Sequence, residues 1–301
     1  MGRPHHGELS PGVDPAALQG ALKWARERYE RCDVCATDCQ VNRHAGELGH
    51  CRLGVQGRVY KEYLHLGEER SLVPSHAVYL AGCNLRCVFC SDWGPVVHPE
   101  RHGAELTPEA LAQRVAQRRR EGARNVNFVG GLPDVNVLYI LETLAHCPPD
   151  THVVWNTNLW TTEEAIDRLT GVVGTWLADL KFGSDRCAKR LAGVDGYTER
   201  LHRLLPLAAR SGELLVRHLL MPGHLECCTR PALEWLRQNV PEATVNLMTG
   251  YHPFALKSSR GPMSGSVEPQ ELQESLALFE SLDFPNAMID GEPVEGPASG
   301  S

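Results

Sequence analysis

The sequence predicts an α/β protein, a partial (βα)6 TIM-type barrel preceded by a small N-terminal Cys-rich metal-binding module. Two observations support this fold class. From about residue 76 onward, short β-rich runs alternate with helical segments, which is typical of parallel βα units. Before that point lies a short, polar stretch with four cysteines. It has too few apolar residues to fold by burial alone, so we expect it to fold around a metal.

The N-terminal unit is expected to span residues 1–70. After a Gly- and Pro-rich start, PAALQGALKWARERYERC carries the helical spacing of Ala, Leu and Trp. The stretch CDVCATDCQVNRHAGELGHC follows, and its cysteines are Cys32, Cys35, Cys39 and Cys51. Four thiols can close a zinc site or bind an iron–sulfur cluster completely, and the spacing does not choose between zinc and a second cluster.

The barrel is expected to span residues 71–290. Its six expected strands lie at residues 76–82, 125–130, 152–158, 175–182, 213–221 and 243–249. Helices are expected between them, one of which begins at Thr107 as N-cap with Pro108 as its first residue. Six repeats fit an open barrel better than a closed eightfold one, and a doubly wound sheet is the alternative. Residues 291–301 are expected to form a disordered tail.

Composition excludes several classes of partner. The formal charge of −7 comes from 37 acidic and 30 basic residues spread along the chain, so neither nucleic acid nor a membrane surface is an expected partner. No stretch has the roughly 18 uninterrupted apolar residues of a membrane helix, and no apolar signal region opens the chain, so we expect it to be cytoplasmic. In that compartment, 11 cysteines indicate metal ligands or redox groups rather than disulfides.

Three further cysteines lie in GCNLRCVFC, directly after the first expected strand. Cys83, Cys87 and Cys90 have the spacing C-x3-C-x2-C, and Phe89 precedes the last of them. A four-iron cluster has four metal corners, so three thiols would leave one iron open to a substrate or cofactor. There are two alternatives: a zinc knuckle that a remote ligand completes, or three buried thiols without a metal. The spacing together with Phe89 favours neither of them.

The three-cysteine stretch resembles the signature of radical S-adenosylmethionine (SAM) enzymes. VNFVGG, VVWNTN, LADLKF and LLVRHLLMPG also occur in the order found in proteins similar to the pyruvate formate-lyase activating enzyme, in a branch with a cysteine-rich N-terminus. This resemblance implies a 4Fe-4S cluster on the three cysteines, with the amino and carboxylate groups of SAM on the fourth iron. It also implies that one electron cleaves SAM to a 5′-deoxyadenosyl radical, which abstracts hydrogen from a substrate.

The same resemblance implies a set of residues that contact SAM. They lie at or near strand ends or in the cysteine loop, and they are Phe89, Gly130, Gly131, Asn156, Asp179, Lys181 and Arg217. Phe89 would pack beside the adenine, while the glycines would let the main chain approach the methionine part of the cofactor. Arg217 would pair with the cofactor carboxylate, and a salt bridge within the protein is its alternative.

One position departs from the family pattern. Leu132 stands where an acidic residue usually accepts a hydrogen bond from the cofactor's amino group. Either a nearby group such as Asp134 or a main-chain carbonyl replaces that acceptor, or the cofactor sits differently, in a position that allows another sulfonium bond to break. The remaining cysteines have no ligand-like spacing and are expected to be buried or incidental thiols, and they are Cys147, Cys187, Cys227 and Cys228.

The resemblance implies an enzyme that acts on a small molecule or a peptide and receives electrons from a flavodoxin- or ferredoxin-type donor. Two other functions stay open. The first is an activase that installs a glycyl radical in a partner protein, which needs a docking surface for that protein. The second is a non-catalytic iron–sulfur or zinc protein in which Leu132 marks the loss of cofactor binding; this protein would hold a cluster without cleaving SAM.

Overall fold

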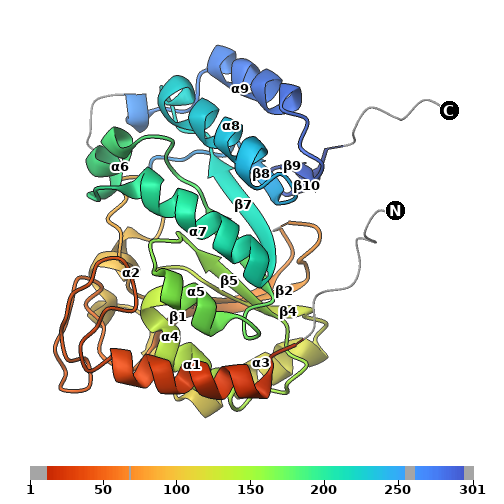
Figure 1. Ribbon diagram of the computed structural model, residues 1–301. Helices are drawn as coiled ribbons and strands as arrows, with labels where there is room; N and C mark the ends of the chain where they lie inside the picture. Colours follow the sequence, from red (N-terminus) through yellow and green to blue (C-terminus); the bar gives the residue numbers. More distant parts are fainter. Residues whose placement is uncertain (1–11, 68, 255–261, 295–301) are drawn as a thin grey trace.

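The computed structural model describes residues 12–67, 69–254 and 262–294 (Figure 1). The strands are β1 (Arg58–His65), β2 (Ser75–Leu80), β3 (Ala104–Glu105), β4 (Asn125–Val129), β5 (Val153–Thr157), β6 (Thr175–Asp179), β7 (Glu213–Leu219), β8 (Thr244–Met248), β9 (Ala287–Ile289) and β10 (Glu292–Pro293). The α-helices are α1 (Pro15–Arg28), α2 (Trp93–Val97), α3 (Pro108–Arg120), α4 (Val137–Leu144), α5 (Glu163–Leu169), α6 (Asp185–Ala192), α7 (Tyr197–Ser211), α8 (Arg230–Asn239) and α9 (Pro269–Ser281). Shorter turns of 3-10 helix lie at Pro99–Arg101, Asp134–Asn136 and Pro262–Ser264, and a π-helical turn lies at Leu225–Thr229.

The strands form one open sheet in the order β10-β9-β8-β7-β6-β5-β4-β2-β1-β3. From β2 to β9 the neighbours pair in parallel, and their order follows the chain without a reversal. A doubly wound sheet reverses its strand order at a switch point, and right-handed crossovers that all run one way place the helices on one face. The sheet is therefore the singly wound, partial barrel that the sequence predicts.

All six strands expected from the sequence are present, with small shifts at their ends. The N-cap at Thr107 is confirmed, because its hydroxyl accepts a hydrogen bond from the Ala110 amide at 3.2 Å. Helix α6 and the short strands at the sheet edges were not expected. The antiparallel strands β1 and β3 extend the β2 edge, and β9 adds a further parallel strand beside β8.

The barrel core consists of apolar strand residues. Most residues of β4, β5 and β6 are buried, as expected for parallel strands that helices cover. Aromatic rings connect neighbouring strands edge to face, with Phe128 at 6.4 Å from Trp155 and Trp155 at 6.4 Å from Trp176. This packing holds the strand ends, and the loops that follow them, in fixed positions.

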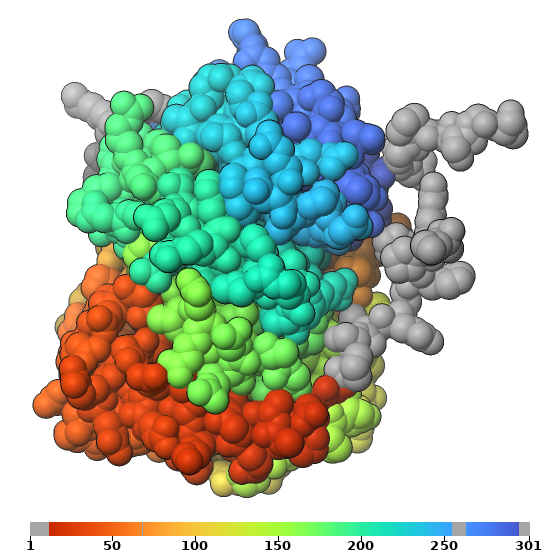
Figure 2. Space-filling view, viewed as in Figure 1, coloured from red at the N-terminus to blue at the C-terminus, as the bar shows by residue number. Residues whose placement is uncertain are grey.

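The N-terminal segment lies against one side of the barrel, as the red and orange surface in Figure 2 illustrates. Helix α1 packs on α4 and α5, and Asp14 caps its start by accepting bonds from two main-chain amides. The cysteine-rich loop lies against the β5–α5 connection, where the main chain at Cys35 forms an isolated antiparallel β-bridge with Thr161. This loop therefore comes next to the carboxyl ends of the barrel strands.

Two other expectations have limited structural counterparts. β1 lies within the segment assigned to the N-terminal unit, yet it pairs with β2 of the barrel, so the unit boundary near residue 70 stays a prediction. Most of the tail at 291–301 falls outside the described residues, and its described part includes β10.

In the described part of the chain, no helix combines the length and apolar character that crossing a membrane requires.

Candidate functional site

The loop after β2 brings Cys83, Cys87 and Cys90 to the carboxyl edge of the sheet. Cys83 and Cys87 are buried, Cys90 is half-buried, and all three are free thiols. Burial raises the pKa of Cys83, and it raises the pKa of Cys87 to about 12 against the opposing effect of Lys181. Without a metal these thiols hold their protons at neutral pH, and metal binding would release them.

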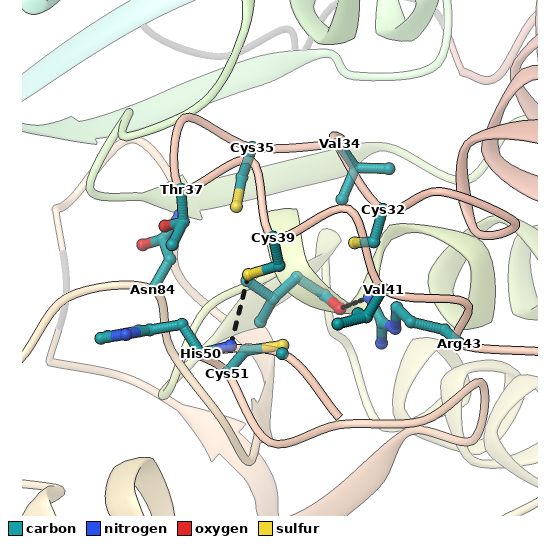
Figure 3. A pocket seen from close by; sticks show the side chains of 12 residues that line it. Cys32, Val34, Cys35, Thr37, Cys39, Val41, Arg43, His50, Cys51 and Asn84 are labelled. Carbon is teal, nitrogen blue, oxygen red and sulfur yellow. Dashed lines mark hydrogen bonds between the residues drawn. The ribbon is translucent and has the colours of Figure 1, made fainter. Parts of the chain in front are cut away.

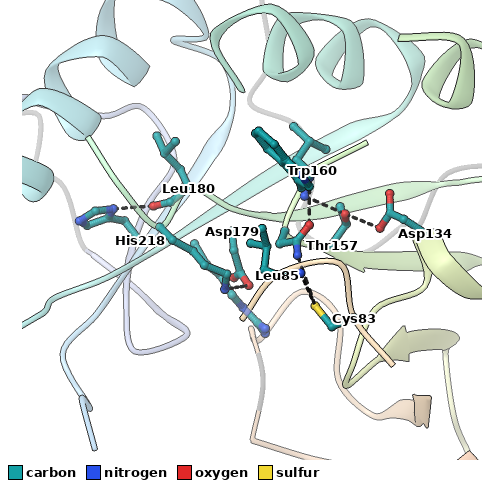
Figure 4. A network of polar contacts seen from close by, with 12 residues as sticks. Cys83, Leu85, Asp134, Thr157, Trp160, Asp179, Leu180 and His218 are labelled. Atoms are coloured by element: carbon teal, nitrogen blue, oxygen red, sulfur yellow. Dashed lines mark hydrogen bonds and ion pairs between the residues drawn. The ribbon is translucent and has the colours of Figure 1, made fainter. Parts of the chain in front are cut away.

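A side-chain network fixes the start of this loop (Figure 4). The Asn158 amide nitrogen donates to Asn84 Oδ1 at 3.0 Å and to Cys83 Sγ at 3.6 Å. Asn84 in turn donates to the Trp160 carbonyl at 2.7 Å. The residues after β5 thus hold the first thiol in place without a covalent link.

The turn after β4 packs directly against the start of the thiol loop. Gly131 has a φ of +39°, and a Cβ added to it would lie only 2.2 Å from the Gly82 carbonyl oxygen, so this close approach requires glycine. The Asn136 amide ties the turn to β2, since it donates to the Ala81 carbonyl at 3.1 Å and to the Leu132 carbonyl at 2.9 Å. The Leu132 side chain is buried and offers no hydrogen-bond acceptor.

Polar side chains gather where β5 ends. The Asn156 amide nitrogen is buried and has no hydrogen-bond partner among the described residues, which suits a donor that awaits a ligand. Asp134, from the turn after β4, is buried and accepts a hydrogen bond from the Thr157 hydroxyl at 2.6 Å. Burial raises the pKa of Asp134. Asp134 therefore lies at the same edge of the sheet as Leu132, the position where the family usually has an acidic residue.

The end of β6 supplies an ion pair next to the thiols. Lys181 Nζ lies 2.5 Å from Asp179 Oδ2. Burial is the largest single influence on the pKa of Lys181 and lowers it, but Asp179, Cys87 and Cys83 together raise this pKa above its usual value. The pair therefore keeps a cation facing the three-thiol loop.

Two further predicted residues have protein partners. Phe89 packs against Phe182 and Tyr251, with ring centroids 6.1 and 6.3 Å away. Arg217 forms a double hydrogen bond with the buried Glu69 at 2.6 and 2.7 Å, which is the salt bridge weighed as its alternative role. A contact of Arg217 with the cofactor carboxylate stays a prediction.

The four N-terminal cysteines surround one small pocket (Figure 3). Cys32, Cys35 and Cys51 are buried and Cys39 is half-buried, with Cys39 Sγ accepting a bond from the His50 amide at 3.3 Å. Asn84 of the thiol loop also lines this pocket. The two thiol sets are thus separated by about one side chain, since Cys83 and Asn84 are adjacent in the sequence.

The candidate metal ligands differ in how closely they lie to one another. Among the described residues, one group of three or more Cys, His, Asp or Glu ligand atoms lies within 4.8 Å of one another, and it is Cys187, His224 and Cys227. No three thiols of the barrel loop or of the N-terminal set, all of which are described, converge that closely. Around one tetrahedral zinc, with bonds of about 2.3 Å, the sulfurs lie about 3.8 Å apart. A four-iron cluster takes each cysteine on a different iron, so it fits more widely spread thiols.

Sequence reasoning missed several residues that build the site. Asn84, Asn136 and Glu69 lie in loops and carry no motif of their own. An arginine at 217 on an apolar strand did signal the need for an anion, but only the fold identifies Glu69 as that anion. The strand-end residues Asn156, Asp179 and Lys181 were expected from the resemblance, and parallel strands bring them to one edge of the sheet. Their contact with SAM stays a prediction.

Comparison with known proteins gives this geometry a context. The family model of the Radical SAM superfamily matches residues 78–251. The chain is 36% identical over 277 residues to an uncharacterized protein of Methanocaldococcus jannaschii, an alignment that covers 90% of this chain and 81% of that protein. Membership of the branch that is similar to the pyruvate formate-lyase activating enzyme stays a prediction.

Solved structures share the fold at low sequence identity. HydG, a maturase of the FeFe-hydrogenase, has a TM-score of 0.53 at 15% identity, with 94% of this chain and 68% of that chain covered. Methylornithine synthase (PylB) has a TM-score of 0.50 at 13% identity, with 95% and 81% covered. Streptococcus suis SuiB bound to SAM has a TM-score of 0.50 at 14% identity and covers 69% of this chain, which spans 47% of the SuiB chain. The matched family model and the homologous protein together establish that this chain belongs to the radical SAM superfamily.

Proposed function

We propose that the chain holds a 4Fe-4S cluster on Cys83, Cys87 and Cys90 and cleaves SAM reductively to abstract hydrogen from a small-molecule or peptide substrate. When bound, the cluster and SAM supply the chemistry, in which one electron splits the sulfonium into methionine and a 5′-deoxyadenosyl radical. One observation carries the proposal: a loop with three free thiols meets the polar ends of β4, β5 and β6 at one edge of the sheet.

The residues around the loop have complementary roles in this proposal. Lys181, kept charged by Asp179, offsets part of the negative charge that three ligating thiolates bring into a buried site. The unpartnered Asn156 amide donates to an oxygen of the cofactor. Gly130 and Gly131 leave main-chain groups accessible, since neither glycine carries a side chain.

Asp134 is proposed to replace the acidic residue absent at Leu132. Its buried carboxylate accepts a hydrogen bond from Thr157 at 2.6 Å, and an ionised carboxylate can accept further hydrogen bonds from a cofactor. A protonated amino group nearby would pair with it and lower its raised pKa. Phe89, within its aromatic cluster, is proposed to seat the adenine.

The N-terminal cysteines are proposed to hold a second iron–sulfur cluster rather than zinc. Four thiols around one pocket can bind every corner of a cluster. A cluster also suits these thiols because no three of their sulfur atoms lie within 4.8 Å of one another. Because Asn84 touches both thiol sets, this cluster would lie on a short route for electrons from an external flavodoxin- or ferredoxin-type donor.

The experiment is anaerobic reconstitution with iron and sulfide, followed by addition of SAM and dithionite and quantification of 5′-deoxyadenosine. The wild type and the control Cys147→Ala are expected to bind about eight irons per chain and to form 5′-deoxyadenosine. Cys87→Ala is expected to lose both about four irons and the product. A cluster without product under any reductant would instead support the non-catalytic metal protein.

The same iron count tests the N-terminal centre. About four irons in the wild type, together with zinc that Cys32→Ala no longer binds, would replace the proposed second cluster by a zinc site at the N-terminal cysteines. Formation of methylthioadenosine in place of 5′-deoxyadenosine would mean that the site around Leu132 directs cleavage to another sulfonium bond.

A further inference from the structure

Helix α6 and the connection between β7 and α8 bring together three potential metal ligands from two distant parts of the sequence. Cys187 lies in the first turn of α6, and its amide donates to the Ser184 cap. His224 and Cys227 come from the connection between β7 and α8. This is the one group among the described residues whose ligand atoms all lie within 4.8 Å of one another. Cys187 is buried, as expected, and Cys227 is half-buried beside it.

The spacing of the two sulfurs fits a single metal ion. Cys187 Sγ and Cys227 Sγ are 3.5 Å apart, close to the separation of about 3.8 Å between two thiolates on one tetrahedral zinc. Cys187 and His224 are each 2% exposed, and Cys227 is half-buried. The site is thus largely shielded from water and open on one side.

The hydrogen bonds of His224 set its ring in the state that a ligand needs. Arg190 can only donate, so its guanidinium, 3.0 Å from His224 Nε2, requires a free electron pair on that nitrogen. The other nitrogen, Nδ1, lies 2.9 Å from the Pro222 carbonyl and therefore carries the proton. A histidine that binds metal through one nitrogen commonly donates to a backbone carbonyl through the other.

The connection that carries two of the ligands is held rigidly. The amides of Gly223, His224 and Leu225 all donate to the Glu271 carboxylate of α9, at 2.9 to 3.1 Å. The guanidinium that faces Nε2 belongs to Arg190, an exposed residue, so it can turn into solvent when another cation takes its place. The connection that carries His224 and Cys227 is therefore held in place, whereas a metal ion can displace the Arg190 guanidinium.

We infer that Cys187, Cys227 and His224 form a zinc site that is separate from both cysteine sets of the iron–sulfur chemistry. Two thiolates and one imidazole suit zinc, and three protein ligands leave its fourth position open to water or a substrate. The site shares an edge with the three-thiol loop, because the Val88 amide donates to the Leu191 carbonyl of α6 at 2.8 Å.

The test uses the full chain after reconstitution with iron and sulfide, so that the other thiols carry their clusters. Zinc is added, unbound metal is removed by desalting, and bound zinc is counted by mass spectrometry for the wild type, Cys227→Ser, His224→Gln and the control Cys147→Ser. The wild type and the control are expected to retain about one zinc more than the other two variants. Zinc X-ray absorption of the wild type is expected to report two sulfur ligands and one imidazole.

Circular dichroism of each variant confirms that it is folded, and Gln at position 224 keeps a polar side chain of similar size. Equal zinc content in all four proteins would overturn the inference, because the zinc would then lie on other ligands. Failure of the folded wild type to bind zinc would overturn it as well, and a Cys187–Cys227 disulfide found in its place would identify a redox-active dithiol.

Discussion

Replacing Gly131 with alanine is expected to destabilise the protein and to displace the three-thiol loop. The added Cβ would lie 2.2 Å from the Gly82 carbonyl oxygen and 2.3 Å from that of Leu80. The left-handed backbone costs a residue with a side chain about 1–2 kcal/mol, and overpacking against main chain adds about 1–3 kcal/mol. The free energy of unfolding is therefore expected to fall by about 2–5 kcal/mol.

Gly196→Ala is the matched control, because Gly196 has a φ of +67° and nothing within 4 Å of an added Cβ. Its expected loss is limited to the backbone cost of about 1–2 kcal/mol. Urea titration compares the two variants, and the iron count after reconstitution is expected to fall only in Gly131→Ala, since Gly82 directly precedes Cys83. Equal stability losses with full iron content in both variants would refute the reasoning.

Three more substitutions test other parts of the account. Glu69→Gln removes the carboxylate that accepts both bonds from Arg217, and urea titration is expected to give a loss of about 3–5 kcal/mol; a loss under 1 kcal/mol would mean that the buried pair is dispensable. Burial lowers the pKa of His218 to about 4 from its ordinary value of about 6.5, so the unfolded chain binds the extra proton between these values and stability falls as the pH drops through them. At 1.36 kcal/mol per pKa unit this loss is about 3 kcal/mol, and His218→Gln is expected to flatten that part of the stability profile; an unchanged profile would assign the acid sensitivity to other groups. Asn158→Leu removes the donor to Cys83, and a chelator is expected to extract iron from this variant faster than from the wild type, whereas equal rates would argue against a role in holding the thiol.

Much of the barrel could be predicted because its signals are local. Each of the six strands is a short run of apolar residues, and Thr107 with Pro108 marks a helix start that the structure confirms. The three-cysteine loop could also be predicted, since its spacing lies within eight residues. Helix α6 was missed because DRCAKRLA is short and mostly polar, so its apolar face of Cys187, Ala188 and Leu191 stands out only once it packs.

Contacts between distant segments could not be predicted in this way. Glu69 meets Arg217 across 148 positions of the chain, and Cys187 meets Cys227 across 40. Neither pair has a spacing that signals contact, because the connections that bring them together are set by the order of the strands. The thiol sets were visible in the sequence, but the positions of their sulfur atoms relative to one another are a property of the fold.

The central claim is that the three-thiol loop holds a cluster with one iron open to SAM. Electron paramagnetic resonance of the anaerobically reduced protein, recorded with and without SAM, tests it most directly. The account predicts that SAM changes the spectrum of the wild type and that the SAM-sensitive signal is absent from Cys87→Ala. A reduced cluster whose spectrum is the same with and without saturating SAM would contradict the claim, because an iron that binds the cofactor cannot keep an unchanged electronic environment.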